Sequence, residues 1–482
     1  MITNFSSNKM NTLQLIESAK YRIDEFRELQ YLGMIPLSGE FYPAGVHYPP
    51  ITMYPDVDQE SFYGTYRPLE SGVYDIYVHI PFCKKKCWFC HYPSKYSAKD
   101  SEKDKYLDAM EREMHLYSEL LNQGRIKARS VLIGGGTPTD LTTKQLHRFL
   151  TYFTKIFDVT KTEQFNYDVD PITLVGNEGI ERLKILKDFG VDRLTIGVQS
   201  FDDSVLNKMN RSHSSDVAFE SIENSKRLGF QTNIEFIFGH PGQTIDNWIS
   251  VLENAIKTDV EEIQMYRLKI YPYGDQEGSV YKNKDKQFDE YVSSDDTILM
   301  KEIAIQLLHK HGYNENLRRV FTKNKKFISK YAFYQCCQLK EEIGLGLTAF
   351  SSLQDRFALN TQSFTQYYEN IRNNKLPINR GLIRDDEQQK RWSIILPLKN
   401  YWINKKIFTE RTGLSINDNF QTKFDLLKKH NMIEEDKSRI ILTAKGAFFA
   451  DEVVTQFEDN KYIPFSRDEY SGGELNPFNN NI

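Results

Sequence analysis

Short runs of β-branched and aromatic residues alternate with longer amphipathic stretches from Val73 onward. The runs have the length and composition of buried strands, and they lie at 73–80, 129–135, 164–170, 192–198, 232–238 and 262–268. The stretches between them, such as KDKYLDAMEREMHLYSELL, have helical spacing. Strand and helix in alternation indicate βα units around a parallel sheet. Six such units predict an α/β fold built on a partial (β/α)6 TIM-like barrel.

The segments on either side of these units have other patterns. Residues 1–72 predict an N-terminal arm, in which Pro49 and Pro50 favour extended backbone. After residue 270 the pattern is less regular, and EEIGLGLTAFSSL (341–353) predicts a late strand and a Gly-rich turn that return to the barrel mouth, so the barrel region is taken as 73–380. Residues 381–460 predict a C-terminal helical, winged-helix-like domain, with two short strands around DKSR. Residues 461–482 are expected to form a flexible tail.

Composition and charge exclude several classes of function. The net charge is -4 and the pI is near 6.3, whereas phosphate backbones and acidic membranes attract a clustered excess of Lys and Arg. No segment approaches the ~20 apolar residues that span a bilayer, and the start has no basic stretch followed by an apolar run. We therefore expect a cytoplasmic monomer that acts on a small molecule and binds neither nucleic acid nor membrane.

The chain has five cysteines, and three of them lie close together in HIPFCKKKCWFC. Cys83, Cys87 and Cys90 have C-x3-C-x2-C spacing directly after the first predicted strand. A structural cluster or zinc site normally has four protein ligands, and no fourth cysteine is near. The triad therefore predicts a [4Fe–4S] cluster whose free iron can chelate S-adenosylmethionine (SAM). A zinc loop completed by His79 or His91, or chance spacing, is the alternative. Cys336 and Cys337 are expected to be structural, with a redox or substrate-contact role as the alternative.

Polar motifs stand at the ends of the next strands, where parallel barrels gather their active sites. IGGGTPT offers bare backbone after the second strand, and YDVDP places Asp168 and Asp170 on one side of the third. GVQSF and NRSH supply Gln199 and Arg211, and Glu235 lies in the fifth strand. An ordinary turn, a helix cap or solvated surface is the competing interpretation of each motif taken alone.

Taken together, YVHIPFC, CWFC, GGGTPT, DVDP, GVQSF, NRSH and FGHPGQT resemble, in order, the oxygen-independent coproporphyrinogen III dehydrogenase family of radical SAM enzymes. The resemblance covers about residues 40–458 and implies the radical SAM type of barrel, a reductant such as flavodoxin or ferredoxin, and two SAM molecules. It implies that the first SAM contacts Tyr77, Phe89, Gly135, Asp168 and the backbone near Phe350. It implies that the second contacts Gly136, Thr137, Gln199, Arg211 and Glu235.

The chain departs from that family at several positions. Asp168 stands where the family usually has Glu, and Glu235 where it usually has Asp. The family's dehydrogenases continue the triad as Cys-x-Cys, whereas Cys90 is followed by His91-Tyr92-Pro93. The haem-chaperone branch has a His-Asn…Tyr-Trp motif that KNKKFISKYAFYQ lacks. We therefore predict that the second SAM serves to methylate or cyclopropanate an unsaturated substrate. Coproporphyrinogen decarboxylation and a non-enzymatic haem-binding chaperone are the alternatives.

Overall fold

The protein is described by a computed structural model that covers residues 12–40, 47–270, 279–282 and 291–479. Its main sheet has 13 strands in the order β10-β11-β9-β8-β7-β6-β4-β1-β12-β13-β14-β15, with β5 (Phe157–Asp158) paired to β4. The six predicted strands are its centre, and they are β1 (Val73–Ile80), β4 (Ile126–Gly135), β6 (Gln164–Val169), β7 (Arg193–Gln199), β8 (Gln231–Phe238) and β9 (Glu262–Arg267). Each is parallel to its neighbour, so the predicted partial barrel is confirmed.

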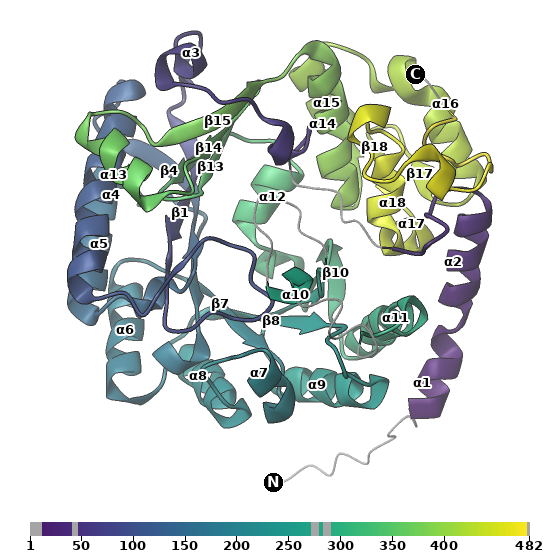
Figure 1. Cartoon of the computed structure of the whole chain (residues 1–482), viewed down its shortest axis with the longest axis horizontal. Helices are drawn as coiled ribbons and strands as arrows, with labels where there is room; N and C mark the ends of the chain where they lie inside the picture. The colour runs from purple at the N-terminus through teal and green to yellow at the C-terminus, as the bar shows by residue number, and fades with distance from the viewer. Residues whose placement is uncertain (1–11, 41–46, 271–278, 283–290, 480–482) are drawn as a thin grey trace.

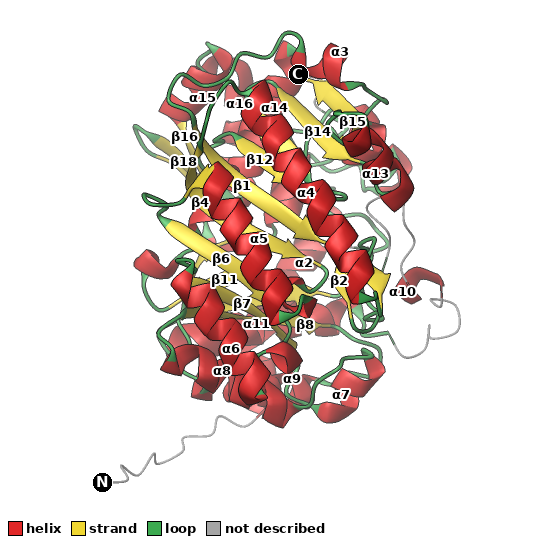
Figure 2. Cartoon of the chain, turned by 90° about the vertical axis from the view of Figure 1, so that its left-hand side faces the viewer, coloured by secondary structure: helices red, strands yellow, loops and turns green. Residues whose placement is uncertain are grey.

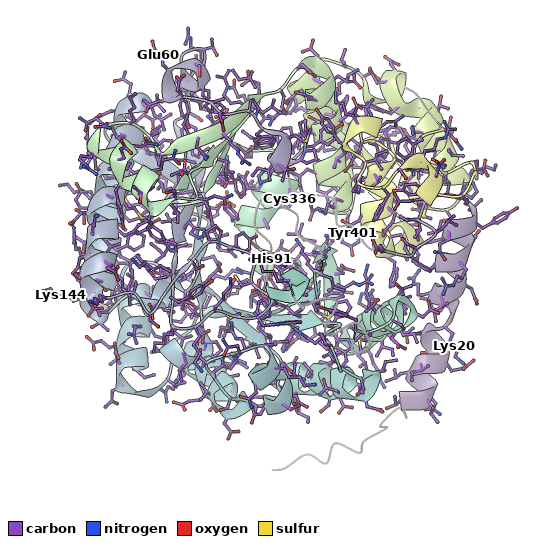
Figure 3. All side chains as sticks on the ribbon, viewed as in Figure 1. Lys20, Glu60, His91, Lys144, Cys336 and Tyr401 are labelled. Carbon is purple, nitrogen blue, oxygen red and sulfur yellow. The ribbon has the colours of Figure 1, made fainter. Side chains whose placement is uncertain are left out.

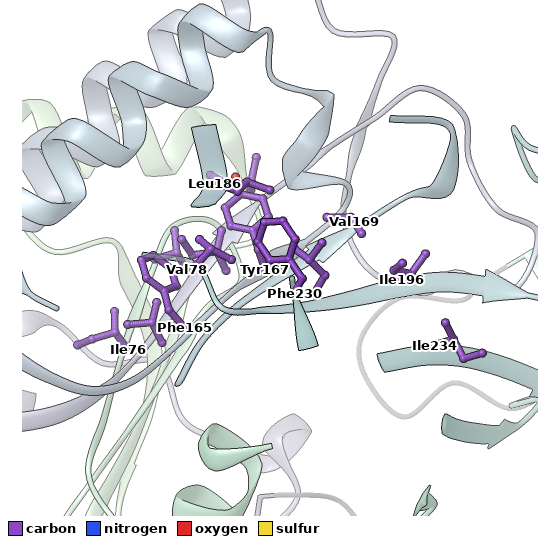
Figure 4. Packing of buried hydrophobic residues seen from close by; sticks show 14 of the residues in the cluster. Ile76, Val78, Phe165, Tyr167, Val169, Leu186, Ile196, Phe230 and Ile234 are labelled. Carbon is purple, nitrogen blue, oxygen red and sulfur yellow. The ribbon is translucent and has the colours of Figure 1, made fainter. Parts of the chain in front are cut away.

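Helices cover the outer face of these strands, as Figures 1 and 2 show for α4, α5 and α6. The covering helices are α4 (Asp100–Leu120), α5 (Thr143–Ile156), α6 (Gly176–Asp188), α7 (Asp203–Lys208), α8 (Ser215–Arg227), α9 (Ile245–Lys257) and α11 (Ser294–Lys310). Because side chains alternate along a strand, Tyr74, Ile76 and Val78 are buried against the helices. Figure 4 shows Ile76 and Val78 with Phe165, Tyr167 and Leu186 in this layer. Asp75 and Tyr77 face the barrel interior instead.

Further strands extend the sheet at both edges. The late strand predicted at 341–353 is β12 (Glu342–Leu345), parallel to β1, followed after a turn by β13 (Phe350–Leu353). The antiparallel strands β14 (Arg356–Asn360) and β15 (Ile378–Ile383) continue this edge, and β10 (Asn314–Leu317) and β11 (Val320–Thr322) lie beyond β9. The remaining short elements of this region are β2 (Phe82–Cys83), β3 (Lys95–Tyr96), α10 (Ser279–Lys282), α12 (Lys330–Cys336) and α13 (Phe364–Arg372).

The C-terminal region has the winged-helix-like arrangement that its sequence predicts. A three-stranded sheet in the order β16-β18-β17 packs with helices around its own core. The elements are α14 (Asp386–Lys399), β16 (Trp402–Asn404), α15 (Lys405–Thr412), α16 (Ile416–Lys429), β17 (Ile433–Glu435), β18 (Arg439–Leu442), α17 (Ala444–Phe448) and α18 (Ala450–Thr455).

Part of the N-terminal arm and residues 461–479 pack against each other beside this domain. The arm contains α1 (Thr12–Ala19), α2 (Tyr21–Tyr31) and α3 (Gln59–Tyr63), and Arg22 of α2 forms a buried 2.8 Å ion pair with Glu302 of α11. Residues 461–479 differ from the expected flexible tail. Leu475 is fully buried because its apolar side chain packs into the C-terminal core. Its N–H also donates to the carbonyl of Leu32 at 2.8 Å. Within the described residues, none of the helices is long and apolar enough to cross a bilayer.

Candidate active site

The cysteine loop lies over the carboxyl ends of the parallel strands. It leaves β1 at Ile80, and a short parallel pairing of β2 with β3 places Cys83 beside Tyr96 and closes it. Beneath it is a pocket of about 1090 Å³. The pocket is lined by most of the predicted site residues: Cys83, Cys87, Phe89, Cys90, Gly135, Gly136, Thr137, Asp168, Gln199, Arg211 and Glu235. Motifs spread over more than one hundred and fifty residues of sequence therefore meet at one place, as βα topology dictates.

The three thiols have the surroundings of a cluster site. Burial raises the pKa of Cys83 to about 12 and also raises that of Cys90. The thiolate form therefore needs a cation, and an iron–sulfur cluster supplies one. Arg211 Nη1 lies 3.0 Å from Cys87 Sγ and donates to it. A Cβ added at Gly136 would lie 2.7 Å from Cys83 Sγ, so only glycine leaves room beside that ligand. This arrangement fits a cluster held by three cysteines.

The zinc alternative finds less support in the geometry. His79 Nδ1 is 2.9 Å from the hydroxyl of Tyr77, and His91 Nε2 is 3.4 Å from the carbonyl of Lys269. His79 is therefore engaged by Tyr77, whereas His91 Nδ1 is buried without a hydrogen-bond partner among the described residues. In the part of the chain that the structure describes, no group of three or more His, Cys, Asp or Glu side chains is arranged to hold a single metal ion.

In the Gly-rich turn after β4, the backbone of Gly135 and Gly136 lines the pocket without intervening side chains. Gly135 has φ of 120°, a conformation that favours glycine. A Cβ at Gly134 would lie 2.5 Å from Asp168 Oδ2. The turn is fixed from the other side, because the N–H groups of Gly136 and Thr137 donate to the carbonyls of Ile80 and Phe82 at 2.9 and 2.7 Å. The absence of a side chain at Gly134 therefore leaves room for the Asp168 carboxylate against the turn.

Two carboxyl groups line the pocket beside this turn. Burial raises the pKa of Asp168 to about 6, although a hydrogen bond from Asn166 Nδ2 at 3.0 Å opposes the shift. Burial raises the pKa of Glu235 to about 8, and the charge of Asp168 adds to this shift. Tyr266, which sequence reasoning missed, donates to Glu235 Oε1 at 3.3 Å. The charge of Arg193 lowers both pKa values but does not overcome burial, and two buried acids in this state favour a cationic ligand.

Asp170 has a different role from Asp168. Burial alone would raise its pKa, but the charge of Arg211, the hydrogen bond and charge of His213 and the Ile172 N–H together outweigh burial and lower the pKa well below its usual range. Arg211 Nη2 is 2.8 Å from Asp170 Oδ2 and donates to the Gly197 carbonyl at 2.7 Å. Asp170 therefore fixes the guanidinium that reaches Cys87, while Asp168 stays available to a ligand.

Gln199 is held in a strained conformation at the end of β7. Its φ is 68°, which is uncommon for a residue with a side chain. Its amide oxygen is buried and has no hydrogen-bond partner among the described residues. A strained backbone and an unsatisfied amide together mark a group that is positioned for a ligand.

Tyr77 and Phe350 lie beside the pocket and are not part of its lining. Their rings stack with centroids 6.0 Å apart, and a Cβ at Gly134 would be 3.6 Å from the Tyr77 ring. His47, from the N-terminal arm, packs edge-on against Phe350 at 4.3 Å. The structure therefore places these two predicted residues in a wall behind Asp168, and the arm supports that wall.

In the cysteine pair outside the triad, Cys337 is buried and Cys336 is half-buried. Figure 3 shows Cys336 near the middle of the molecule, and burial raises its pKa to about 12. Cys337 is 1% exposed, and burial raises its pKa as well. Thiols this hard to ionise are poor nucleophiles, which agrees with the structural role expected for them.

Comparisons with known proteins identify the class. Residues 77–255 match the sequence profile of the Radical SAM superfamily. The chain is 27% identical over 388 residues to the heme chaperone HemW of Bacillus subtilis (strain 168), an alignment that covers 79% of this chain and 98% of that protein. It is 25% identical over 398 residues to the oxygen-independent coproporphyrinogen III oxidase of Escherichia coli (strain K12), covering 80% and 85%.

A solved structure agrees with the fold. The coproporphyrinogen III oxidase HemN from Escherichia coli superimposes with a TM-score of 0.73 at 22% identity, covering 86% of this chain and 96% of that one. The chain therefore carries a radical SAM domain, and such a domain implies a [4Fe–4S] cluster and SAM. Its homologues are the coproporphyrinogen III oxidases and heme chaperones named above.

Proposed function

We propose that this protein is an enzyme that reductively cleaves SAM at a cluster held by Cys83, Cys87 and Cys90, and uses the resulting radical on a small organic substrate. The observation that carries the proposal is the meeting of the three thiols, the bare Gly134–Gly136 backbone and the carboxyl of Asp168 in one pocket. When bound, the reduced cluster supplies the electron that splits SAM into methionine and a 5′-deoxyadenosyl radical. A protein such as flavodoxin or ferredoxin supplies the electrons.

The protein's own residues bind and orient in this reaction. The Gly135 backbone receives the amino group of SAM, and Asp168 accepts hydrogen bonds from its ribose. Tyr77 and Phe350 form the wall behind them, with Phe89 on the cysteine loop. Because SAM carries a sulfonium, its charge compensates the buried carboxyl of Asp168, whose pKa is about 6 without a ligand.

A second SAM is supported by polar groups that the first does not use. Gln199 Oε1 is unsatisfied, Glu235 is a buried acid, and Gly136 and Thr137 line the same pocket. Arg211 is fixed by Asp170 at the boundary between this set and the cluster.

Two reactions follow from two different observations. The names of the relatives favour a tetrapyrrole substrate. Hydrogen abstraction from a propionate side chain would then be followed by loss of carbon dioxide and of one electron, taken by a one-electron acceptor such as an oxidised ferredoxin, which leaves a vinyl group. The residues after Cys90, His91-Tyr92-Pro93, favour methyl or methylene transfer from the second SAM, because they depart from the decarboxylating pattern. We place tetrapyrrole oxidation first, since the relatives that support it cover most of this chain.

The first test concerns SAM cleavage. Anaerobically reconstituted protein with SAM and dithionite should release 5′-deoxyadenosine, which liquid chromatography measures directly. Cys87→Ala should release none, while Cys336→Ala, which changes a cysteine outside the triad, should release as much as the wild type. Equal release by Cys87→Ala, or no release by the wild type with several reductants, would contradict the proposal. The second result is also what a non-enzymatic haem-binding carrier predicts.

The second test separates the two reactions. With methyl-deuterated SAM and coproporphyrinogen III, tetrapyrrole oxidation should yield unlabelled deoxyadenosine and carbon dioxide. Methyl-group activation should instead place deuterium in deoxyadenosine and in a product. Deuterated deoxyadenosine without carbon dioxide would reverse the order of preference given above.

A further inference from the structure

The segment that carries the cysteine triad is strongly basic, although the chain as a whole is slightly acidic. Residues 81–99 contain five lysines and no Asp or Glu, whereas the net charge of the chain is -4. Lys84, Lys85 and Lys86 fill every position between Cys83 and Cys87. The positive charge is therefore concentrated on the loop that holds the thiols, and neither binding nor orientation of SAM has assigned a role to Lys86.

The acids nearest to this loop are already matched by other cations. Residues 95–105, which lead into α4, contain four lysines and three acids, and Glu102 forms an ion pair with Lys95 and accepts from the Lys99 N–H at 2.9 Å. Asp170, below the loop, is paired with Arg211. Among the described residues, the side chains of residues 84–86 form no salt bridge with a carboxylate. Three positive charges therefore remain for a partner.

The structure holds these three lysines in a fixed place over the cluster site. Asn210 Nδ2 donates to the Lys86 carbonyl at 2.7 Å, and the Trp88 N–H donates to the Met209 carbonyl at 3.0 Å. Lys86 Nζ lies 5.9 Å from the ring centroid of Tyr96, the residue that pairs with Cys83 across β2 and β3. The loop is therefore anchored to the barrel from beneath.

The loop has one face toward the pocket and one toward solvent. The three lysine side chains are exposed, and the three thiols are half-buried. Lys84 and Lys85 also reach the rim of the SAM pocket, whereas Lys86 does not line it. A partner that contacts Lys86 from outside is therefore separated from the cluster by this short loop alone.

This position favours an electron donor over other anionic partners. Electron transfer between proteins slows steeply with distance, so a donor must dock where the cluster lies nearest to the surface. Flavodoxins and ferredoxins are small proteins with acidic surfaces around their prosthetic groups. Complexes of this kind have small interfaces and depend on complementary charge for encounter and orientation. A compact cluster of lysines on an otherwise acidic chain supplies that complementarity.

We propose that Lys84, Lys85 and Lys86 form the docking surface for a small acidic electron-transfer protein, whose prosthetic group approaches the cluster across the cysteine loop. The donor gives up one electron and the cluster takes up the same electron. This inference rests on the proposed function, because only a protein with a reducible cluster needs such a partner.

The first experiment measures binding and not turnover. A fluorescently labelled bacterial flavodoxin is titrated with the full reconstituted protein under anaerobic conditions, without SAM and at low ionic strength. Lys86→Glu should weaken the affinity by about tenfold, because a repulsive charge replaces an attractive one. Lys86→Arg should bind as the wild type does. The difference should disappear at high salt, since screening removes interactions between exposed charges.

The matched control is Lys161→Glu, which makes the same change of charge at an exposed lysine in the turn before β6, at the opposite end of the strands. It should leave the affinity unchanged. Should Lys86→Glu fail to bind iron, as elemental analysis would reveal, Lys86→Gln removes the charge without placing an acid beside the thiols and should weaken binding about threefold. Equal affinity in wild type and the Lys86 variant, or an equal loss in Lys161→Glu, would overturn the proposal.

The second experiment compares two reductants and separates this proposal from the proposed function. With reduced methyl viologen, a small cation that needs no acidic surface, Lys86→Glu should release 5′-deoxyadenosine as fast as the wild type. With limiting reduced flavodoxin, the variant should be about tenfold slower. An equal slowing with both reductants would show that Lys86 acts on the cluster and not on docking. If the wild type releases none with either reductant, the proposed function fails, while the affinities still decide the docking surface.

Discussion

At the scale of single residues, the candidate site contains side chains that the fold holds in an unfavourable conformation, without a hydrogen-bond partner, or with a shifted pKa. Gln199 sits at φ 68° with an unsatisfied amide oxygen, and Asp168 and Glu235 are acids that burial holds toward their neutral forms. Each lowers the stability of the empty protein, and each is relieved by a ligand with hydrogen-bond donors and positive charge. SAM provides both, which is why these residues are stronger evidence than the motifs alone.

Glu235 should make stability depend on pH. Its pKa is about 8 in the folded protein and near 4.5 when unfolded, so its contribution is complete below pH 4.5 and is lost as the pH rises toward 8. Glu235→Gln cannot ionise, so from pH 6 to pH 9 the wild type should lose about 2–3 kcal/mol of unfolding free energy relative to the variant. Denaturant unfolding at several pH values measures it. A pH-independent difference would contradict the assignment.

Sequence alone predicted the residues that follow strands in short motifs, such as Asp168, Gln199 and the cysteine triad, because parallel strands bring their carboxyl ends together. Sequence alone did not predict that Tyr266 and His47 lie at the site. Tyr266 contacts Glu235 through the neighbouring strand, and His47 meets Phe350 across about three hundred residues of chain. Such contacts are set by register and by the path of the arm. The period-two pattern of β9 was the one available signal for Tyr266.

At the scale of elements, a buried carboxyl fixes the turn that presents Phe350. Glu113 of α4 accepts from the N–H of Gly346 at 2.9 Å, from Tyr367 Oη at 2.6 Å and from Asn360 Nδ2 at 3.1 Å. Burial raises the pKa of Glu113 to about 8. The Glu113 side chain thereby connects a barrel helix to β14, to α13 and to the turn after β12. These hydrogen bonds fix the position of that turn, which contains Gly346.

Removing one of these hydrogen bonds should weaken the whole edge of the sheet. Tyr367→Phe removes the hydroxyl that donates to Glu113 and should lower the free energy of unfolding by about 1–2 kcal/mol, because the buried acceptor loses a partner. Tyr368→Phe changes the adjacent, partly exposed residue of α13 and should have an effect below about 0.5 kcal/mol. Urea unfolding compares them, and equal effects would show that Glu113 does not depend on Tyr367.

The elements that the sequence predicted are those with long, regular patterns. The six central strands were found within a few residues, and so was the late strand beside β1. Strands β10, β11, β14 and β15 were not predicted, because each is short and antiparallel and lies near one end of the sheet, where burial comes from the arm, α12 and the C-terminal domain. Local periodicity contains little information on such partners.

At the scale of the whole molecule, both chain ends close the structure on its C-terminal side, as Figure 1 shows for α2 beside the winged-helix-like region. Ser471 Oγ donates to the Tyr31 carbonyl at 2.6 Å, and a Cβ added at Gly33 would lie 2.8 Å from the Ser471 carbonyl oxygen. Ser471 and Leu475 therefore hold the arm against the C-terminal domain. We infer that the tail, residues 461–479, restrains the arm and that the two are energetically coupled.

Leu475 tests this coupling. It is fully buried between the arm and the C-terminal core, so Leu475→Ala should lower the free energy of unfolding by about 2–4 kcal/mol through lost burial and the cavity left behind. Limited proteolysis should then cut the arm within residues 12–40 faster than in the wild type, since the tail no longer restrains it. Leu414→Ala, at an exposed leucine of the same domain, should change neither quantity. If Leu475→Ala lowers stability while the arm stays as resistant as before, the tail supports the C-terminal core alone and the coupling is wrong.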